Sequence, residues 1–123
     1  MATRIKYTGS TPGADSNTYK LYDTTDNGLT DLFSHCGISK YVLQLSHSHG
    51  GTLKWYKSMD AGATWDQIGQ ESIPAPASAN EITSRDILVE GFLDFKAEWE
   101  NGGTAQDPWN VSQALSKERS SAA

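Results

Sequence analysis

Apolar and polar residues alternate with a period of two in several short stretches of the chain. In residues 40–48, KYVLQLSHS, the side chains of Tyr41, Leu43 and Leu45 fall on one side of an extended backbone. In residues 92–100, FLDFKAEWE, one side carries Leu93, Phe95, Ala97 and Trp99, and the other carries Phe92, Asp94, Lys96 and Glu98. This period is typical of a β-strand with one buried face. Both stretches are therefore predicted to be half-buried strands.

Further strands are predicted between turn signals, at residues 18–23, 52–58, 64–70 and 109–116. A short strand is also expected near residues 4–7. Two prolines make residues 73–80 a loop, and the segment after it leads into the strand at 92–100. The apolar spacing at 29–37 fits either one or two helical turns or a loop with apolar anchors. Short strands with almost no helix predict one all-β domain, an antiparallel β-sandwich or jelly roll.

The two ends of the chain differ in composition from its middle. Residues 1–17 are rich in Thr, Ser, Gly and Pro, which predicts a flexible N-terminal arm. Residues 117–123, KERSSAA, are small or charged and are expected to fray. The predicted sandwich domain therefore occupies residues 18–116.

Composition narrows the classes of partner. Only 37% of the 123 residues are apolar, with four Trp, five Tyr and three Phe, so we expect a thin aromatic core that completes its burial against another subunit. The net charge is −5 and no basic stripe occurs, which argues against nucleic acid as a partner. No apolar run suits a signal peptide or a membrane span, and Cys36 alone cannot form an internal disulfide. We therefore expect synthesis in a cytoplasm, no membrane partner, and a buried, inert Cys36 thiol.

The most specific motif is Ser58-Met59-Asp60-Ala61-Gly62-Ala63-Thr64-Trp65, which reads S-x-D-x-G-x-T-W. The Asp60 carboxylate can accept bonds from loop N–H groups, and Gly62 can adopt a positive φ. The hydroxyls of Ser58 and Thr64 can join the strand ends, while Trp65 is expected to enter the core. The motif resembles the Asp-box of sialidases and other propeller-type glycan enzymes, where it is a structural hairpin remote from catalysis. It occurs once here, whereas a propeller needs several blades and a longer chain.

The sequence lacks the pattern of a glycosidase. Such an enzyme needs two carboxylates at a defined separation, and sialidases also use an arginine cluster. Arg4, Arg85 and Arg119 are far apart in the sequence. Asp94 and Glu98 share a strand face with Lys96 between them, which indicates a charge-balanced, solvated surface. We therefore expect no catalytic residues, no cofactor and no enzyme activity.

Two histidines, in His47-Ser48-His49, are candidate metal ligands. Residues at i and i+2 share a strand face and could bind Zn or Ni, with further ligands from His35, Cys36 or a distant carboxylate. The alternative is a polar strand end that runs into the Gly50-Gly51 turn. The second interpretation is preferred, so no metal site is expected.

The aromatic residues on adjacent predicted strands allow a binding hypothesis. They are Trp55, Tyr56, Trp65, Trp99 and Trp109. Two of them on an exposed face could stack on sugar rings, as in carbohydrate-binding modules. Core packing is the ordinary use of such residues and is the default expectation.

The closing segment at 91–120, GFLDFKAEWENGGTAQDPWNVSQALSKERS, together with the β-rich body and polar arm, resembles small virion proteins of tailed bacteriophages. These are capsid decoration or cement proteins and related head or tail accessory proteins. The resemblance implies a non-enzymatic homotrimer on a virion, bound to the major capsid protein or another virion protein, and it assigns no functional residue. Our own hypothesis is that the contacts are made by the polar arm at residues 1–17 and the loop at 73–80. An acidic surface and a partner-binding arm agree with this. The alternatives are a carbohydrate-binding module that uses Trp55 or Trp109, and a hydrolase fragment.

Overall fold

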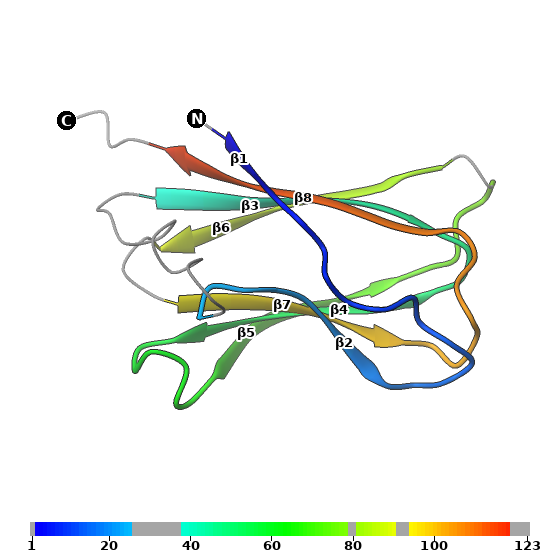
Figure 1. Cartoon of the computed structure of the whole chain (residues 1–123), viewed down its shortest axis with the longest axis horizontal. Helices are drawn as coiled ribbons and strands as arrows, with labels where there is room; N and C mark the ends of the chain where they lie inside the picture. Colours follow the sequence, from blue (N-terminus) through cyan, green and yellow to red (C-terminus); the bar gives the residue numbers. More distant parts are fainter. Residues whose placement is uncertain (1, 26–37, 79–80, 91–93, 119–123) are drawn as a thin grey trace.

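The described part of the chain is built from strands alone. A computed structural model describes residues 2–25, 38–78, 81–90 and 94–118, and these contain no helix. The eight strands (Figure 1) are β1 (Ala2–Ile5), β2 (Thr18–Asp23), β3 (Ile38–His47), β4 (Gly51–Ser58), β5 (Asp66–Ile73), β6 (Thr83–Glu90), β7 (Asp94–Asn101) and β8 (Trp109–Glu118). The segment 29–37, with His35 and Cys36, and residues Phe92, Leu93 and Arg119 lie outside the described residues.

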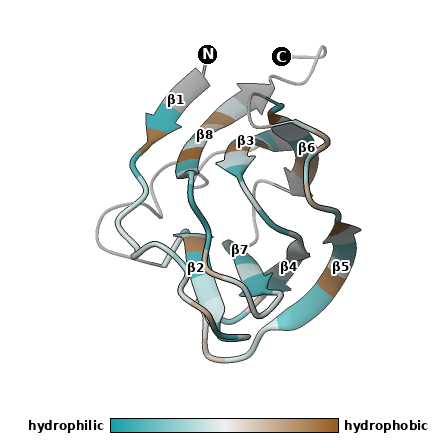
Figure 2. Ribbon diagram, turned by 90° about the vertical axis from the view of Figure 1, so that its right-hand side faces the viewer, coloured by the Kyte–Doolittle hydropathy of each residue, from teal (hydrophilic) through white to brown (hydrophobic). Residues whose placement is uncertain are grey.

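The strands form two antiparallel four-stranded sheets, ordered β1-β8-β3-β6 and β2-β7-β4-β5, which pack as two layers (Figure 2). Strands pair from the outside of the sequence inward: β1 with β8, β2 with β7, β3 with β6 and β4 with β5. Successive pairs alternate between the two sheets. This arrangement is a jelly roll, in which a long, folded ribbon wraps into a sandwich. The predicted all-β sandwich is confirmed.

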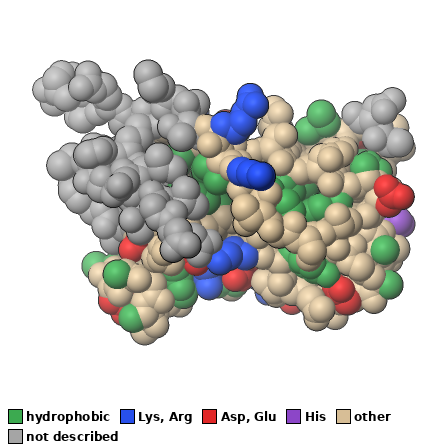
Figure 3. Space-filling model, in the orientation of Figure 1, with side chains coloured by type: hydrophobic (Ala, Val, Ile, Leu, Met, Phe, Trp, Pro, Cys, Tyr) green, Lys and Arg blue, Asp and Glu red, His purple; other side chains and the backbone are tan. Residues whose placement is uncertain are grey.

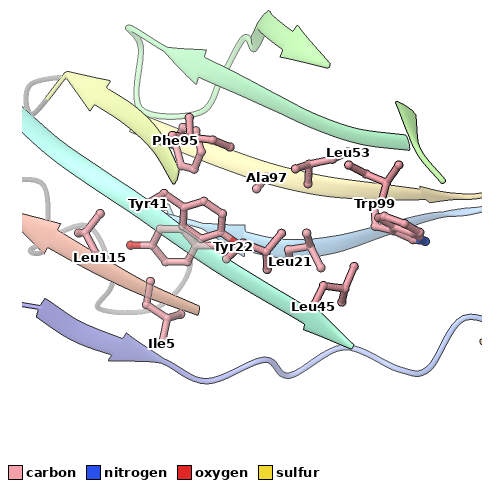
Figure 4. Packing of buried hydrophobic residues seen from close by; sticks show 13 residues of the cluster. Ile5, Leu21, Tyr22, Tyr41, Leu45, Leu53, Phe95, Ala97, Trp99 and Leu115 are labelled. Carbon is pink, nitrogen blue, oxygen red and sulfur yellow. The ribbon is translucent and has the colours of Figure 1, made fainter. Parts of the chain in front are cut away.

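The core lies between the sheets, and the predicted alternation places its residues. Tyr41, Leu43 and Leu45 of β3 are buried, as are Phe95, Ala97 and Trp99 of β7. Figure 4 shows Tyr41 and Leu45 pointing toward the layer that carries Phe95, Ala97 and Trp99. Fully burying one such large side chain contributes about 1.5–3 kcal/mol. The two strands with the clearest alternation therefore supply the middle of the core.

An aromatic stack with one buried amide lies at the centre of the core. The rings of Tyr22 and Tyr41 are parallel with centroids 5.7 Å apart, and Phe95 packs at 5.4 Å from Tyr41. The Tyr41 hydroxyl donates to Gln113 Oε1, and Gln113 Nε2 donates to the Leu21 carbonyl at 2.8 Å. Burial raises the pKa of Tyr22 and Tyr41 above the ordinary tyrosine value. The amide of Gln113 is thus satisfied across the two layers.

Two strand predictions need correction. The strand predicted at 64–70 begins only at Asp66 and runs to Ile73, because Thr64 belongs to the preceding turn. The segment 83–90 was treated as a lead-in, yet it forms the full strand β6 beside β3. Its pattern is weak because Ile87 is its one core residue among those whose side chains are described, and the two other inward positions among them, Thr83 and Arg85, are polar. β8 also continues to Glu118, past the predicted domain end at 116.

The N-terminal segment, predicted to be an arm, contacts the sandwich in its first and last parts. Residues Ala2–Ile5 form β1, which pairs with β8, so the expected strand at 4–7 lies two residues earlier. Pro12 is fully buried, and the carbonyl of Asn17 accepts a hydrogen bond from the Asn101 amide at 3.0 Å. Residues 6–17 cross from one sheet to the other along the open side of the sandwich (Figure 1). The N-terminal segment is therefore part of the folded body.

Candidate functional site

The Asp-box forms the hairpin turn between β4 and β5. The Asp60 carboxylate accepts bonds from the Thr64 amide at 2.9 Å, from the Thr64 hydroxyl at 2.6 Å and from the Ser58 hydroxyl at 2.7 Å. Ser58 Oγ in turn accepts from the Gly62 amide at 2.8 Å. Gly62 has φ +92° and Ala61 has φ +57°, so two consecutive residues are left-handed. These local bonds fix the turn.

The electrostatics of Asp60 follow from those bonds. Donation from the Thr64 side chain, then from the Thr64 backbone and Ser58, lowers the pKa of Asp60 to about 2. A carboxylate that accepts several hydrogen bonds is stabilised in its charged form. Asp60 is exposed at the hairpin tip, and all its bonds stay within residues 58–64. Its role in the described structure is that of a turn anchor.

Trp65 does not enter the core, so that expectation is wrong. Its indole is half-buried and lies outside the buried cluster. The ammonium group of Lys96 lies 4.8 Å from the ring centroid of Trp65 and 4.8 Å from that of Tyr56. Lys96 also pairs with Glu98 at 3.5 Å. The Lys96 cation of β7 therefore contacts the ring of Tyr56 in β4 and the ring of Trp65 just before β5.

The two histidines weighed as metal ligands do not converge. His47 is buried, and its Nδ1 lies 2.8 Å from the His49 carbonyl, which can only accept, so Nδ1 carries the proton. Its Nε2 lies 2.8 Å from the Thr83 hydroxyl. His49 is exposed and lies outside β3, with Nδ1 2.8 Å from Ser48 Oγ. Both nitrogens of His47 are engaged, one by the turn at His49 and one by Thr83 of β6. Among the described residues no three His, Cys, Asp or Glu side chains gather as metal ligands do.

A polar network that the sequence did not reveal closes the opposite end of the sandwich from the Asp-box. Gln106 Oε1 accepts from the amides of Ser48 at 3.0 Å and His49 at 2.9 Å. Its Nε2 donates to the His49 carbonyl and to Asn101 Oδ1. The Gln106 amide donates to the Pro12 carbonyl at 3.0 Å. Gln106 therefore connects the Ser48–His49 turn and Asn101 through its side chain, and Pro12 through its backbone N–H.

Asn101 extends this network to the N-terminal segment. Its Nδ2 donates to the carbonyls of Gly13 at 2.8 Å, Asp15 at 3.0 Å and Thr104 at 3.0 Å. Its Oδ1 accepts from the buried Trp99 indole at 3.2 Å. The segment NGGTAQDP predicted a turn, and two amide residues in it were the only sign of this role. Their partners are distant in sequence, so no local pattern could identify them.

Most of the aromatic residues that are candidates for sugar stacking pack in the core or against it. Trp99 is fully buried, as the default expectation held. Trp109 lies 5.5 Å from Trp99 between ring centroids, and Trp55 packs against the core and over Gly69. Tyr56 contacts the Lys96 cation. Of these, Trp109 is the one that also lines an open groove.

That groove, with a volume of about 950 Å³, lies where the N-terminal segment separates from β8. It is lined by the exposed cations Arg4 and Lys6, by the half-buried Tyr7, Trp109 and Val111, and by polar side chains such as Ser112. Figure 3 shows positively charged side chains beside a band of hydrophobic ones on this face. The Tyr7 and Trp109 rings meet edge to face at 6.2 Å. This groove is the candidate binding site.

The groove carries one buried donor without a hydrogen-bond partner. The indole Nε1 of Trp109 is inaccessible to solvent, and no acceptor meets it with hydrogen-bond geometry. Burial raises the pKa of the nearby Tyr7 hydroxyl, and the Trp109 side chain offsets part of that rise. That hydroxyl itself donates to the Ser10 carbonyl at 2.6 Å. The Trp109 N–H therefore lies close to Tyr7 but remains unsatisfied.

The far edge of the sandwich, formed by β5 and β6, is closed differently. The Arg85 guanidinium donates to both Glu71 carboxylate oxygens, at 2.7 and 2.6 Å, and so joins the two sheets. This bond lowers the pKa of Glu71. Ile82 and Leu88, beside and on β6, are 57% and 65% exposed. This edge therefore has an ion pair between the two sheets and exposed apolar side chains beside it.

Comparison with known proteins adds no family to these observations. No model of a protein family matches the chain, and no curated protein is significantly similar to it. The part of the chain that the structure describes contains no helix capable of crossing a membrane.

Proposed function

We propose that this chain is a non-enzymatic structural protein of a bacteriophage virion, which attaches to the capsid as a homotrimeric decoration or cement protein. The observation that carries the proposal is the strand order of the two sheets, because the jelly roll is used by viral capsid proteins and by lectins. A fold hosts many functions, so the further support comes from how its side chains are used.

The polar side chains that were candidates for catalysis or metal binding make structural hydrogen bonds. Asp60 anchors a turn, and the ring nitrogens of His47 contact the turn at His49 and the first residue of β6. Asn101 and Gln106 connect three connecting segments at one end. Side chains arranged in this way suit a rigid body that presents fixed surfaces to a partner.

The segment that resembles phage virion proteins supplies an inner strand of each sheet. β7 lies between β2 and β4, and β8 lies between β1 and β3. The turn that joins them, residues 102–108, belongs to the polar network. The resemblance therefore covers the framework of the domain, which supports a shared architecture with those proteins.

The later part of the N-terminal segment and the connection that follows β5, both within the segments expected to contact the capsid, lie at the same end of the sandwich. Gln106 joins Pro12 to the turn at His49, and the neighbouring Gly50 packs against the backbone of Ile73 and Ala75. Figure 1 shows the connections from β1 to β2 and from β5 to β6 at that end. We propose that this end, opposite the Asp-box hairpin, faces the capsid.

The test uses phage particles that lack the gene, to which purified chain is added back. Occupancy is measured by quantitative mass spectrometry, and capsid stability by the temperature of DNA release. Wild type should fill a fixed number of sites and raise that temperature. Glutamates at the exposed Ala14 and Ala77 should weaken binding about tenfold or more, whereas the matched Ala63→Glu at the hairpin end should not. Capsids that neither bind the chain nor gain heat stability would overturn the proposal.

The homotrimer can be tested separately by light scattering. Exposed Ile82 and Leu88 flank the free edge of β6, where a second copy would shield apolar surface. Wild type should have about three times the mass of one chain, and Leu88→Ser should shift the distribution toward monomer. A monomer at every concentration would remove the trimer from the proposal.

A carbohydrate-binding module is the second candidate, favoured by the presence of Trp109, Tyr7 and polar side chains in one groove. A glycan array distinguishes the two, with Trp109→Phe and Trp65→Ala as variants. A sugar preference that Trp109→Phe removes and Trp65→Ala retains would favour the module. A decoration protein should show no preference.

A further inference from the structure

We propose that the groove beside β8 binds an extended, acidic polypeptide segment of a partner protein, which adds to the sheet as a strand next to β8. The inference deepens the proposed function, since it names the kind of partner segment that this protein would hold. It rests on three observations in one place: an open strand edge, an apolar floor and two cations.

The open edge follows from the pairing of β8 with its two neighbours. β1 pairs with β8 only from Ala2↔Ser116 to Ile5↔Gln113, whereas β3 pairs with β8 as far as His47↔Trp109. Residues 109–112 therefore have a strand partner on one side only. In an antiparallel sheet, alternate residues direct N–H and C=O to opposite sides, so about four backbone groups face the groove. An added strand would satisfy them.

The floor of the groove suits the side chains of such a strand. Tyr7, Trp109 and Val111 are half-buried and line the groove, so alternate apolar side chains of a bound strand could cover them. Gln44, Asn110 and Ser112 line the outer side, where polar side chains of the strand would lie.

The charge of the groove selects an acidic segment. Arg4 and Lys6 are exposed, line the groove and form no ion pair that the structure records for the described residues. They lie on a chain with net charge −5, so the groove is a basic site on an acidic protein. Residues that alternate acidic and apolar would complement both the cations and the floor.

The test uses the peptide acetyl-Glu-Val-Glu-Ile-Glu-Val-amide, titrated into ¹⁵N-labelled full-length protein and followed by NMR. Amides of residues 109–112 should shift in a saturable manner. The same peptide N-methylated at alternate residues, which removes backbone donors, should bind at least tenfold more weakly. A Lys-for-Glu version should also bind more weakly, and added NaCl should reduce the affinity of the acidic peptide.

Matched variants assign the charges. Arg4→Gln with Lys6→Gln should weaken binding about three- to tenfold, as expected for two exposed ion pairs. Lys20→Gln with Lys57→Gln removes equal charge from the other sheet and should leave binding unchanged. Equal affinity for the N-methylated peptide, shifts at other residues, or saturation of residues 109–112 by an oligosaccharide or a second copy instead would overturn the proposal.

The outcome is distinguishable from that of the capsid experiment. If phage particles do not bind the chain but the acidic peptide binds beside β8, the virion function fails and the groove assignment stands. If particles bind the chain and the peptide does not, the groove assignment alone fails.

Discussion

The two ends of the sandwich are held by hydrogen bonds of opposite kinds. At the Asp-box end, Asp60, Ser58 and Thr64 bond to one another within a span of seven residues. At the other end, the side chains of Gln106 and Asn101 bond to residues up to 88 positions away. The first end closes a single hairpin, whereas the second joins connections from both sheets. One end is therefore held by bonds within a single motif, and the other by bonds between segments that are distant in the sequence.

Among the variants that test this difference between the two ends, Asn101→Ala should have the largest effect on stability. The Asn101 side chain is 2% exposed and serves three carbonyls and the Trp99 indole, so its removal leaves several buried polar groups unsatisfied. We expect the free energy of unfolding to fall by about 3 kcal/mol. Urea denaturation measures the change, and hydrogen exchange at residues 13–17 reports release of the N-terminal segment.

The control for this variant is Asn110→Ala, on the exposed side of β8. Its effect should stay within about 0.5 kcal/mol. Equal effects of the two substitutions would show that the network contributes nothing beyond an ordinary surface asparagine.

A smaller effect is expected from alanine at the two positive-φ glycines, one at each end. Gly62 has φ +92° and Gly103 has φ +105°, so each substitution costs about 1–2 kcal/mol from the left-handed backbone. A Cβ on Gly62 would lie 3.0 Å from Thr25 Cγ2, whereas one on Gly103 would meet nothing within 4 Å. Gly62→Ala should therefore destabilise more than Gly103→Ala in thermal unfolding. The reverse order would contradict the packing of the hairpin against Thr25.

The same contrast explains how much the sequence could predict. Alternation placed Tyr41, Leu43 and Leu45 correctly, because one buried face imposes a period of two on any such strand. The Asp-box bonds were readable because donor and acceptor lie within one motif. β6 was missed because its inward Arg85 pairs with Glu71 of the other sheet, a contact that no local pattern encodes. The groove depends on where β1 leaves β8, which only the three-dimensional register defines.

The smallest expected effect is that of acid, which should protonate Asp60 at the Asp-box end. The pKa of Asp60 is lowered from its usual value of 3.8 to about 2, chiefly by the Thr64 hydroxyl and amide. Folding therefore favours the ionised form: its contribution is complete above about pH 4 and is lost as the pH falls through about 2. NMR titration should show the Thr64 amide shifting with an apparent pKa near 2.

The opposite end offers an internal reference for that titration, because the side chains of Asn101 and Gln106 are amides and do not ionise. Their side-chain NH₂ signals should keep their positions over the range in which the Thr64 amide moves, provided the fold persists. In Asp60→Asn the Thr64 amide should no longer titrate near pH 2. A Thr64 shift that survives this substitution, or that moves together with the Gln106 signals, would mean that acid acts on the whole sandwich and not on the carboxylate at the hairpin.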